Sequence, residues 1–324
     1  MKNGFTSRKK RLFYCLLACL LLCFSLASCA PDAEQKTEYL RFCDSTGEEV
    51  ILYNRPERVA VLFSSFAEMW TLAGGRVFVS VGESVERGFC SPDTPLVDAG
   101  AGKTVNLELL IAQSPDLVIC SADIAAQADA AALLKEAGIP CALFRVESFA
   151  DYLSVLRIMT DITGDTAAYA QNGQAVKAQI DALKETYAQK AGEKILFIRA
   201  GSSARSTKAK DADGHFAASM LEELGCSNVA DNAPLLLDGL SIEEILREDP
   251  DRIFITTMGD EDSARAYMDS LLEGEIWSSL TAVKCGKVHY LPKDLFQFKP
   301  NARWGTAYRY LAEILYENDS DATE

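Results

Sequence analysis

Residues 106–119 read NLELLIAQSPDLVI, and residues 241–254 read SIEEILREDPDRIF. The two segments align without a gap at a constant offset of 135 in the numbering (243 − 108). Three aligned positions are identical: Glu108 and Glu243, Pro115 and Pro250, Asp116 and Asp251. A spacing this large exceeds the period of a solenoid repeat and fits two copies of one domain-sized α/β unit. Two similar lobes facing each other form a cleft, where a binding site is expected.

The N-terminus has the pattern of an export signal. Basic residues stand at Lys2 and at positions 8–11, and an almost unbroken apolar run covers residues 12–26. This run is shorter than the roughly 20 residues needed to span a bilayer. Residues 26–29 (LASC) resemble a bacterial lipobox, in which the thiol of Cys29 takes a diacylglycerol before cleavage. The alternative is an ordinary signal peptide with a cysteine at this position by chance.

We therefore predict a signal peptide over residues 1–28 and a tether over residues 29–38 that starts at the lipidated Cys29. Two or three acyl chains would anchor the chain stably to the outer face of the cell membrane, an extracytoplasmic location. Removal of the signal peptide takes away five of the 32 Lys and Arg and none of the 47 Asp and Glu, so the mature chain carries a net charge of −20 (27 − 47). A surface of this sign disfavours nucleic acid as a partner.

The cysteines form no recognisable metal or disulfide motif. Of the ten cysteines, three precede Cys29 and six follow it without CxxC spacing. Cys120 and Cys141 lie at the end of one apolar run and at the start of the next. We interpret them as small buried hydrophobic residues, with a disulfide as the alternative that export permits.

Short apolar runs alternate with helical patterns in both halves of the chain, which is typical of parallel βα units. After an antiparallel pair at 40–53, the first half predicts strands at 59–63, 77–81, 117–120 and 141–144, and helices at 66–72, 107–112 and 125–137. The second half predicts strands at 195–199, 252–256 and 288–291, and helices at 216–224, 242–246, 263–272 and 302–316.

The loop after the first strand differs in length between the halves. Ile195 is offset from Ala60 by 135 (195 − 60), which is the offset of the repeat. Gly225 is offset from Gly74 by 151 (225 − 74). The loop between these positions is therefore longer in the second half, by a difference of about 16 (151 − 135).

The segment between the halves is helical, with one break at residues 163–165. It predicts a long helix that carries the chain from one lobe to the other. The predicted fold class is therefore α/β, with two similar lobes around mostly parallel sheets, one long connecting helix and a ligand cleft between the lobes. The expected parts are an N-terminal lobe at 39–150, a connecting helical segment at 151–191, a C-terminal lobe at 192–317 and an acidic tail at 318–324.

These features together resemble the helical-backbone substrate-binding lipoproteins of bacterial ABC importers, which take up ferric siderophores, haem and cobalamin. The resemblance rests on the lipobox, the paired Glu-x6-Pro-Asp segments and the long connecting helix, and it covers residues 40–316. Residues 55–59 (RPERV), Ala67-Glu68 and residues 286–288 (GKV) also fit the pattern. The resemblance implies a monomeric receptor, neither an enzyme nor dependent on a cofactor, that captures a ferric siderophore and delivers it to an ABC permease with its ATPase.

The resemblance also gives the paired glutamates a role. It implies that Glu108 and Glu243, one in each lobe, dock onto arginines of the permease. The structural alternative is that each is an exposed carboxylate favoured by a helix N-terminus.

Candidate ligand contacts lie at the carboxyl ends of predicted parallel strands, where such sheets place their ligands. In the long loop of the second half, residues 201–210 (GSSARSTKAK) concentrate cations and hydroxyls within an acidic chain. Guanidinium and ammonium donors suit an anionic ligand with many oxygens, although a solvated charged loop is the alternative. The candidates are Ser64, Ser65, Phe66 and Arg87 in the first half, and Arg199, Arg205, Lys208, His215, Lys299 and Arg303 in the second.

Other ligands and functions remain open at this point. Haem or cobalamin would depend more on Phe63, Phe66, Phe298 and Trp304. A chelatase-like enzyme could use His215 as an acid or base, and a structural or adhesive lipoprotein is a third possibility. With only His215 and His289, a multi-histidine site for bare Zn²⁺ or Mn²⁺ cannot be built, so no metal site is predicted. Residues 100–104 (GAGKT) mimic a phosphate-binding loop, but position 97 is valine where that motif needs glycine.

Overall fold

The computed structural model describes residues 37–98, 104–190 and 192–316. Every described helix and strand lies in the compact unit that begins at Tyr39. The predicted signal peptide, Cys29, most of the tether, the phosphate-loop mimic at 100–103 and the acidic tail lie outside the described residues.

The unit begins with an antiparallel pair, β1 (Leu40–Cys43) and β2 (Glu49–Leu52), as predicted. The turn between the strands is closed by Asp44, whose Oδ1 accepts hydrogen bonds from the backbone N–H of Thr46 at 2.9 Å and of Glu48 at 3.2 Å. Gly47 adopts φ 84°, a conformation that glycine takes without steric cost.

A three-stranded parallel sheet follows, with its strands in the order β3 (Val59–Val61), β4 (Leu117–Ser121) and β5 (Cys141–Phe144). Its helices are α2 (Ser64–Leu72), α3 (Gly82–Glu86), α4 (Leu107–Ala112) and α5 (Ala125–Glu136). We call this sheet and its helices the first lobe. Every residue of the three strands is buried, as expected for parallel strands covered on both faces.

The strand predicted at 77–81 is wrong as a regular element. This segment makes only isolated bridges, Ala60 to Val79 and Ser80 to Leu96. The Ser80 hydroxyl donates to the Val61 carbonyl at 2.8 Å, and α3 begins at Gly82. The extended run therefore ends too early to form a ladder of hydrogen bonds.

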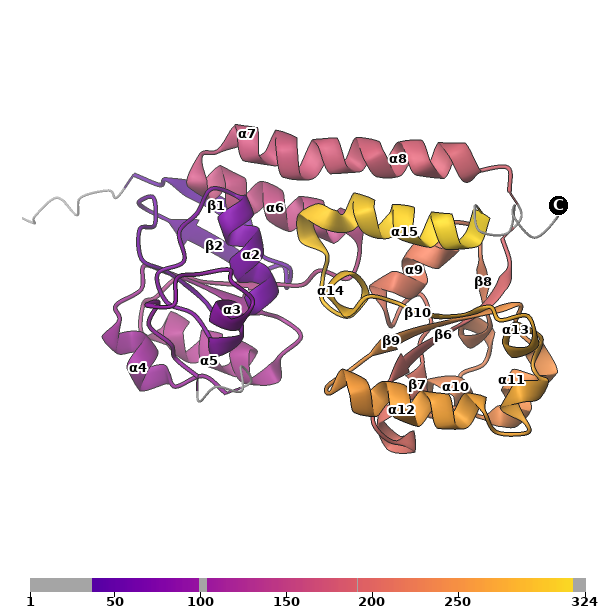
Figure 1. Cartoon of the computed structure of the whole chain (residues 1–324). Coiled ribbons are helices and arrows are strands. Elements are labelled where there is room, and N and C mark those ends of the chain that lie inside the picture. Colours follow the sequence, from indigo (N-terminus) through magenta and orange to yellow (C-terminus); the bar gives the residue numbers. More distant parts are fainter. Residues whose placement is uncertain (1–36, 99–103, 191, 317–324) are drawn as a thin grey trace, which may run out of the picture. The chain divides into compact units, whose positions relative to one another are not determined.

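The connection between the lobes is helical, as predicted. It consists of α6 (Phe149–Thr163), α7 (Thr166–Tyr169), one π-helical turn (Ala170–Gln174) and α8 (Ala175–Tyr187). Gly164, at φ 75°, ends α6, and the Asp165 carboxylate caps α7 by accepting from the Ala168 N–H at 2.9 Å. Figure 1 shows α7 and α8 as one rod along the top, beside the terminal helix α15 (Trp304–Tyr316).

The second lobe is built on a five-stranded sheet. Its path runs β10 (Val288–Tyr290), β9 (Arg252–Thr257), β6 (Lys194–Ala200) and β7 (Lys208–Ala209), and β8 (Ser227–Asn228) also pairs with β6. All pairings are parallel except that of β6 with β7. Its α-helices are α9 (Phe216–Glu223), α10 (Leu235–Asp238), α11 (Ile242–Glu248), α12 (Glu261–Leu272), α13 (Thr281–Lys284), α14 (Lys293–Phe296) and α15. Short 3₁₀ turns lie at Ala204–Ser206, Val229–Asn232, Trp277–Ser279 and Asn301–Arg303.

The sequence repeat corresponds to equivalent contacts in the two lobes. The Asp116 carboxylate accepts from the backbone N–H of Arg58 at 2.9 Å, and the Asp251 carboxylate accepts from that of Lys194 at 2.9 Å. Each aspartate thus holds the start of the neighbouring strand. Ser114 and Asp249 are aligned positions of the repeat, between the end of the helix and the Pro-Asp pair. Both adopt a positive φ, 46° at Ser114 and 41° at Asp249.

The strand register corrects one predicted alignment. Val59 pairs with Leu117, and Ile195 pairs with Arg252. Because Leu117 and Arg252 are aligned in the repeat, Ile195 corresponds to Val59 rather than to Ala60, an offset of 136 (195 − 59). The second-lobe loop is accordingly longer by 15 (151 − 136), one position less than the sequence alignment predicts.

Both lobes contain buried apolar cores, and one apolar cluster includes residues of the two lobes and of α6, α8 and α15. Cys120 and Cys141 are buried free thiols, as the preferred interpretation predicted, and burial raises the pKa of the Cys141 thiol to about 12. None of the described helices is long and apolar enough to cross a membrane.

Candidate functional site

The long loop of the second lobe folds back onto its own sheet. Lys208 lies opposite Arg199 in the antiparallel pairing of β7 with β6, and Lys210 follows one residue beyond β7. The Thr207 hydroxyl closes the loop by donating to the Gly201 carbonyl at 3.0 Å and accepting from its N–H at 3.1 Å. The hairpin therefore gathers three cations, Arg199, Lys208 and Lys210, at the carboxyl end of β6.

His215 lies close to Arg199 and Lys210, whose charges act on it. The residue is 7% exposed, and its ring contacts those of Phe197 and Phe216, with centroids 4.8 and 4.9 Å away. Its Nδ1 accepts from the Ala217 N–H at the start of α9, so the proton is on Nε2. Burial, followed by the charges of Lys299, Arg199 and Lys210, lowers the pKa of His215 well below its usual value.

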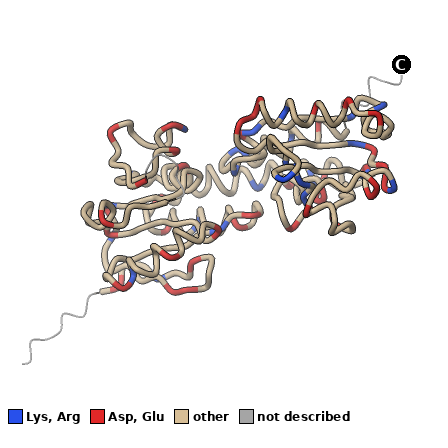
Figure 2. The backbone as a smooth tube through the Cα atoms, turned by 90° about the horizontal axis from the view of Figure 1, so that it is seen from below, with Lys and Arg blue, Asp and Glu red and all other residues tan. Residues whose placement is uncertain are grey.

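Lys299 completes the group. Its Nζ lies 4.8 Å from the centroid of the Phe216 ring, and its charge acts on His215. We call Arg199, Lys208, Lys210 and Lys299 the cationic cluster. Mutual repulsion is evident in Lys210, whose pKa is lowered by burial and then by the charge of Arg199. Figure 2 shows Lys and Arg on both lobes, with several of them close together in one region of the second lobe.

Several polar atoms next to the cationic cluster are buried and have no hydrogen-bond partner among the residues that the structure describes. They are Nε of Arg199 and the hydroxyls of Thr256 and Thr257. Arg199 and Thr256 are register partners on β6 and β9. Because buried polar groups nearly always have a hydrogen-bond partner, these atoms mark a place where water or a ligand supplies one.

In the first lobe, the predicted serines and Arg87 form one hydrogen-bonded group. The Ser64 hydroxyl donates to Glu83 Oε2 at 2.6 Å, and Arg87 Nη1 donates to the hydroxyls of Ser64 at 3.0 Å and Ser65 at 3.5 Å. The guanidinium of Arg87 stacks on Phe89 at 4.6 Å. Ser64 and Ser65 are buried, at 1% and 2% exposed, and the charges of Glu83 and Glu68 balance that of Arg87 in part.

The segment 297–303, which we call the bridging segment, joins this group to the second lobe. Phe298 lies under the Arg87 guanidinium at 4.1 Å, and Lys299 forms an ion pair with Glu147 at 3.0 Å. Asn301 donates from Nδ2 to the Ser65 carbonyl at 3.0 Å and to Glu68 Oε2 at 2.7 Å. Predicted residues from the two halves of the chain are thus brought together.

Two predicted residues lie apart from this arrangement, and a third, Arg303, lies within it, where its charge acts on Glu68 and Arg87. Phe66 is 2% exposed and packs against Phe144 in the core, so we assign it to packing. Arg205 is exposed on the 3₁₀ turn Ala204–Ser206, where no described residue pairs with it. Arg303 is held by Asp294 through an ion pair at 2.6 Å.

Sequence reasoning left out Glu147, Glu68 and Asn301. Asn301 lies in a segment that the sequence singles out, and its φ of 50° suits asparagine better than most residues. Glu68 is noted in the sequence only as part of the family pattern at Ala67-Glu68, and Glu147 carries no local signal. The contacts that place them in the site come from partners 233 and 152 residues away in the chain.

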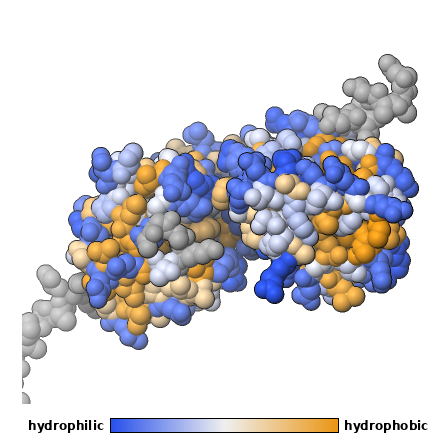
Figure 3. All heavy atoms as spheres, turned by 60° about the horizontal axis from the view of Figure 1, so that its bottom comes forward, coloured by the Kyte–Doolittle hydropathy of each residue, from blue (hydrophilic) through white to orange (hydrophobic). Residues whose placement is uncertain are grey.

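Glu108 and Glu243 occupy equivalent, exposed places in the first turns of α4 and α11. Neither carboxylate has a hydrogen bond or ion pair within the part of the chain that the structure describes. Exposed apolar side chains stand near them in sequence, Leu109 and Ile111 on α4 and Leu246 on α11. Figure 3 views the molecule tilted so that the lower side of Figure 1 comes forward, and it shows apolar areas on both lobes.

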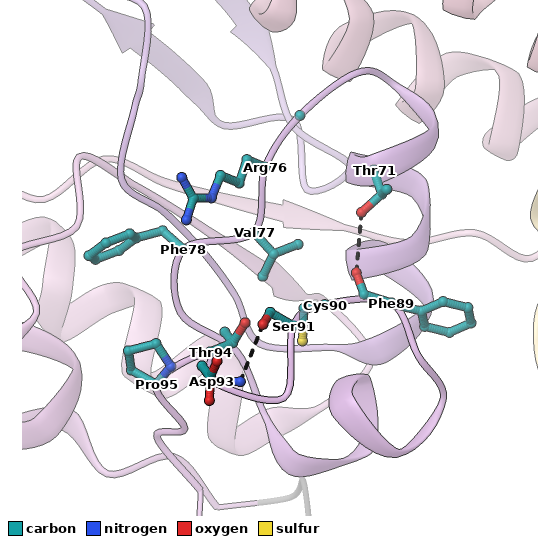
Figure 4. A pocket seen from close by; sticks show the side chains of 11 residues that line it. Thr71, Arg76, Val77, Phe78, Phe89, Cys90, Ser91, Asp93, Thr94 and Pro95 are labelled. Atoms are coloured by element: carbon teal, nitrogen blue, oxygen red, sulfur yellow. Dashed lines mark hydrogen bonds between the residues drawn. The ribbon is translucent and has the colours of Figure 1, made fainter.

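A separate cavity of about 360 Å³ lies in the first lobe, between the end of α2 and the loop that follows α3. Figure 4 shows Arg76 and Asp93 at its walls, with Val77 and Phe78 between them. Of the residues discussed above, only Phe89 lines it. Among the described residues, no group of three or more His, Cys, Asp and Glu is placed to hold a metal ion.

Comparison with known proteins identifies relatives of this chain. The profile of a family described as periplasmic binding protein matches residues 59–295. No curated protein matches the chain in sequence.

Solved structures share the fold at low sequence identity. A periplasmic solute binding protein from Veillonella parvula is 20% identical, with a TM-score of 0.66 over 86% of this chain and 87% of that one. SirA of Staphylococcus aureus, complexed with staphyloferrin B, is 17% identical, with a TM-score of 0.65 over 87% of this chain and 98% of that one. IsdE of S. aureus, complexed with heme, is 15% identical, with a TM-score of 0.65 over 80% of this chain and 98% of that one.

Proposed function

Because this chain belongs to the periplasmic binding protein family, we propose that it is the extracytoplasmic receptor of an ABC importer and that its cargo is a ferric siderophore. In this proposal the receptor catalyses nothing, and ATP hydrolysis belongs to the importer. The fold alone does not select the cargo, because the similar structures include complexes with staphyloferrin B and with heme. The choice therefore depends on the side chains of the site.

The observation that carries the proposal is the cationic cluster with its unpartnered donor. A chain of net charge −15 places Arg199, Lys208, Lys210 and Lys299 together. The buried Nε of Arg199 lacks an acceptor among the described residues. An anionic chelate with several oxygens would supply acceptors for these donors, and a guanidinium binds such oxygens in a fixed geometry.

The aromatic side chains give less support to haem or cobalamin. Phe66 is 2% exposed and Trp304 is fully buried. Phe298 is occupied by the Arg87 guanidinium at 4.1 Å. Of the four predicted rings this leaves Phe63, which is partly exposed and packs edge-on against Phe66, as a platform for a flat macrocycle, so we rank haem and cobalamin second.

Fluorescence titration tests the proposal. Trp304 packs edge-on against Phe149 and Phe216, and the Phe216 ring also contacts Lys299, so its emission should report binding at the cluster. The full-length protein would be titrated with a ferric tris-catecholate, a ferric tris-hydroxamate, haemin and cyanocobalamin. We expect quenching by a ferric siderophore, and binding of haemin or cyanocobalamin alone would refute the assignment.

Substitution should then locate the site. Arg199→Met and Lys210→Met should each weaken siderophore binding by about tenfold or more, since each removes a charge-assisted contact. Lys284→Met is the matched control, because Lys284 is an exposed second-lobe lysine outside the cluster. If all three variants bound the siderophore with the same affinity, the ligand would bind away from the cationic cluster.

For delivery, we propose that Glu108 and Glu243 dock onto basic residues of the permease. Support comes from their equivalent places in the two lobes, their exposure and the apolar side chains beside them on α4 and α11. The double variant Glu108→Gln, Glu243→Gln should keep ligand affinity but lose uptake in cells. Glu136→Gln with Glu222→Gln, two exposed glutamates on other helices, is the control. Normal uptake by the first pair would exclude the docking role.

A further inference from the structure

Within the described residues, Lys299 is the one member of the cationic cluster that forms an ion pair with a carboxylate from the first half of the chain. Its side chain is 18% exposed and its Nζ lies 3.0 Å from Glu147 Oε2. Glu147 follows β5, whereas Lys299 lies in the bridging segment 152 residues later. An anion that approaches the cluster therefore meets a lysine whose charge is already neutralised from the first lobe.

The position of Glu147 is fixed by the start of α6. Asp151 Oδ2 accepts from the backbone N–H of Glu147 at 3.0 Å and from that of Ser148 at 2.9 Å. Ser148 completes a capping box by accepting from the Asp151 N–H at 3.1 Å. With its backbone held in this way, Glu147 presents its carboxylate to Lys299 from a rigid helix end.

The two partners differ in exposure, because the Lys299 side chain is 18% exposed and the Glu147 carboxylate faces solvent. The Glu147 side chain is 44% exposed, so its interaction with Lys299 is screened by water and is replaceable by another anion. Arg199 and Lys210, which act on the same His215, have no carboxylate of the first lobe against them within the described residues. The ion pair thus occupies one part of a site whose other donors stay open.

Resting on the proposed function, we propose that Glu147 is a specificity-determining residue that acts as an internal competitor for the anionic cargo. Its carboxylate occupies Lys299 in the unliganded receptor, and the cargo must replace it. A trianionic ferric tris-catecholate can take over Lys299 together with the other cations of the cluster. A neutral ferric tris-hydroxamate cannot replace a carboxylate on a lysine, and a weak monoanion gains too little from the exchange. Glu147 therefore selects for high ligand charge.

The test is the charge-neutral variant Glu147→Gln, which keeps the side-chain length and an oxygen for Lys299. We expect it to bind the ferric tris-catecholate about fivefold more tightly than the wild type. Breaking an exposed ion pair of this kind changes an affinity by at most about fivefold. Affinity for the neutral ferric tris-hydroxamate should change by less than about twofold. Asp123→Asn is the matched control, because Asp123 pairs with Arg145 in the same lobe and both side chains are exposed. The gain should vanish in the double variant Glu147→Gln, Lys299→Met.

A second measurement keeps this inference separate from the choice of cargo. Acetylation of Lys299 would be followed by mass spectrometry while citrate, a small trianion, is added, with Lys135 as the internal reference. In the Glu147→Gln variant, citrate should protect Lys299 at about a fivefold lower concentration than in the wild type. Equal citrate midpoints, or equal tris-catecholate affinities, would overturn the competitor role. A wild type that binds none of the ferric complexes would refute the proposed function, and the citrate midpoints would still decide the role of Glu147.

Discussion

Replacing Asp116 with alanine should destabilise the protein about twice as much as the same change at Asp251, although the two residues are identical positions of the repeat. Asp116 uses both carboxylate oxygens, accepting from the N–H of Glu57 at 2.8 Å and of Arg58 at 2.9 Å. Asp251 accepts from one backbone donor, Lys194 N–H, at 2.9 Å. Asp116 therefore holds the start of its strand with two backbone hydrogen bonds, whereas Asp251 holds the equivalent place with one.

The magnitudes follow from the number of bonds. A hydrogen bond to a charged group contributes about 1.5–3 kcal/mol, and the lower end applies here because these positions are partly exposed. Asp116→Ala should therefore cost about 3 kcal/mol and Asp251→Ala about 1.5 kcal/mol of unfolding free energy. For a chain of this size these losses correspond to falls in Tm of about 6 °C and about 3 °C.

Thermal unfolding of the two variants would be compared with Asp93→Ala, which removes an exposed loop carboxylate. Hydrogen exchange adds a local readout, because the Arg58 amide should lose protection in Asp116→Ala and the Lys194 amide should lose it in Asp251→Ala. Glu108→Gln, only eight positions from Asp116 in the repeat, should change stability by less than about 0.5 kcal/mol. Equal costs for the two aspartate variants, with Arg58 exchange unchanged, would refute the reasoning.

Three further outcomes are expected. Burial lowers the pKa of His215 below its usual 6.5, so the unfolded chain binds more protons than the folded one just below pH 6.5, and the free energy of unfolding falls on acidification. His215→Gln should flatten this pH dependence, measured by urea titrations from pH 7.5 to 5. The same dependence of stability on pH in the variant and the wild type would contradict this prediction. Glu193→Gln should lower the free energy of unfolding by about 3 kcal/mol in the same assay, because it weakens the 2.6 Å ion pair with Arg252, whose side chain is only 2% exposed. Glu49→Gln is the control and should change stability little, because its ion pair with Arg41 is exposed. Cys29→Ser should release the protein from the membrane fraction of cells, and retention would refute the lipid anchor.

Local patterns were sufficient for most of the fold. The Glu-x6-Pro-Asp repeat located α4 with β4 and α11 with β9, because a short helix followed by a buried strand is encoded within about fifteen residues. The break at residues 163–165 was also predicted, since Gly164 ends α6 and Asp165 caps α7. Each of these features depends on residues close together in the chain.

The failures have non-local causes. Residues 77–81 have the composition of a strand, but the Ser80 hydroxyl bonds to Val61 and α3 begins at Gly82. The loop after β6 gave no strand signal for β7, whose two residues are defined by their pairing with β6. The same limit applies to the site, since Glu147 is identified only through a lysine 152 residues away.

The two lobes differ most where the sequence repeat is interrupted. Asp116 and Asp251 keep equivalent bonds to the first strand of each sheet, and the glutamates keep equivalent exposed places. The additional length after β6 forms the β7 hairpin, which places Lys208 opposite Arg199, whereas the corresponding turn of the first lobe leads directly from β3 into α2. In the first lobe Arg87 is balanced by Glu83 and Glu68, whose charges act on it. Among the described residues, the cationic cluster is thus a local feature of the second lobe that has no equivalent in the first, so we expect an anionic ligand to bind with its charged groups toward the second lobe.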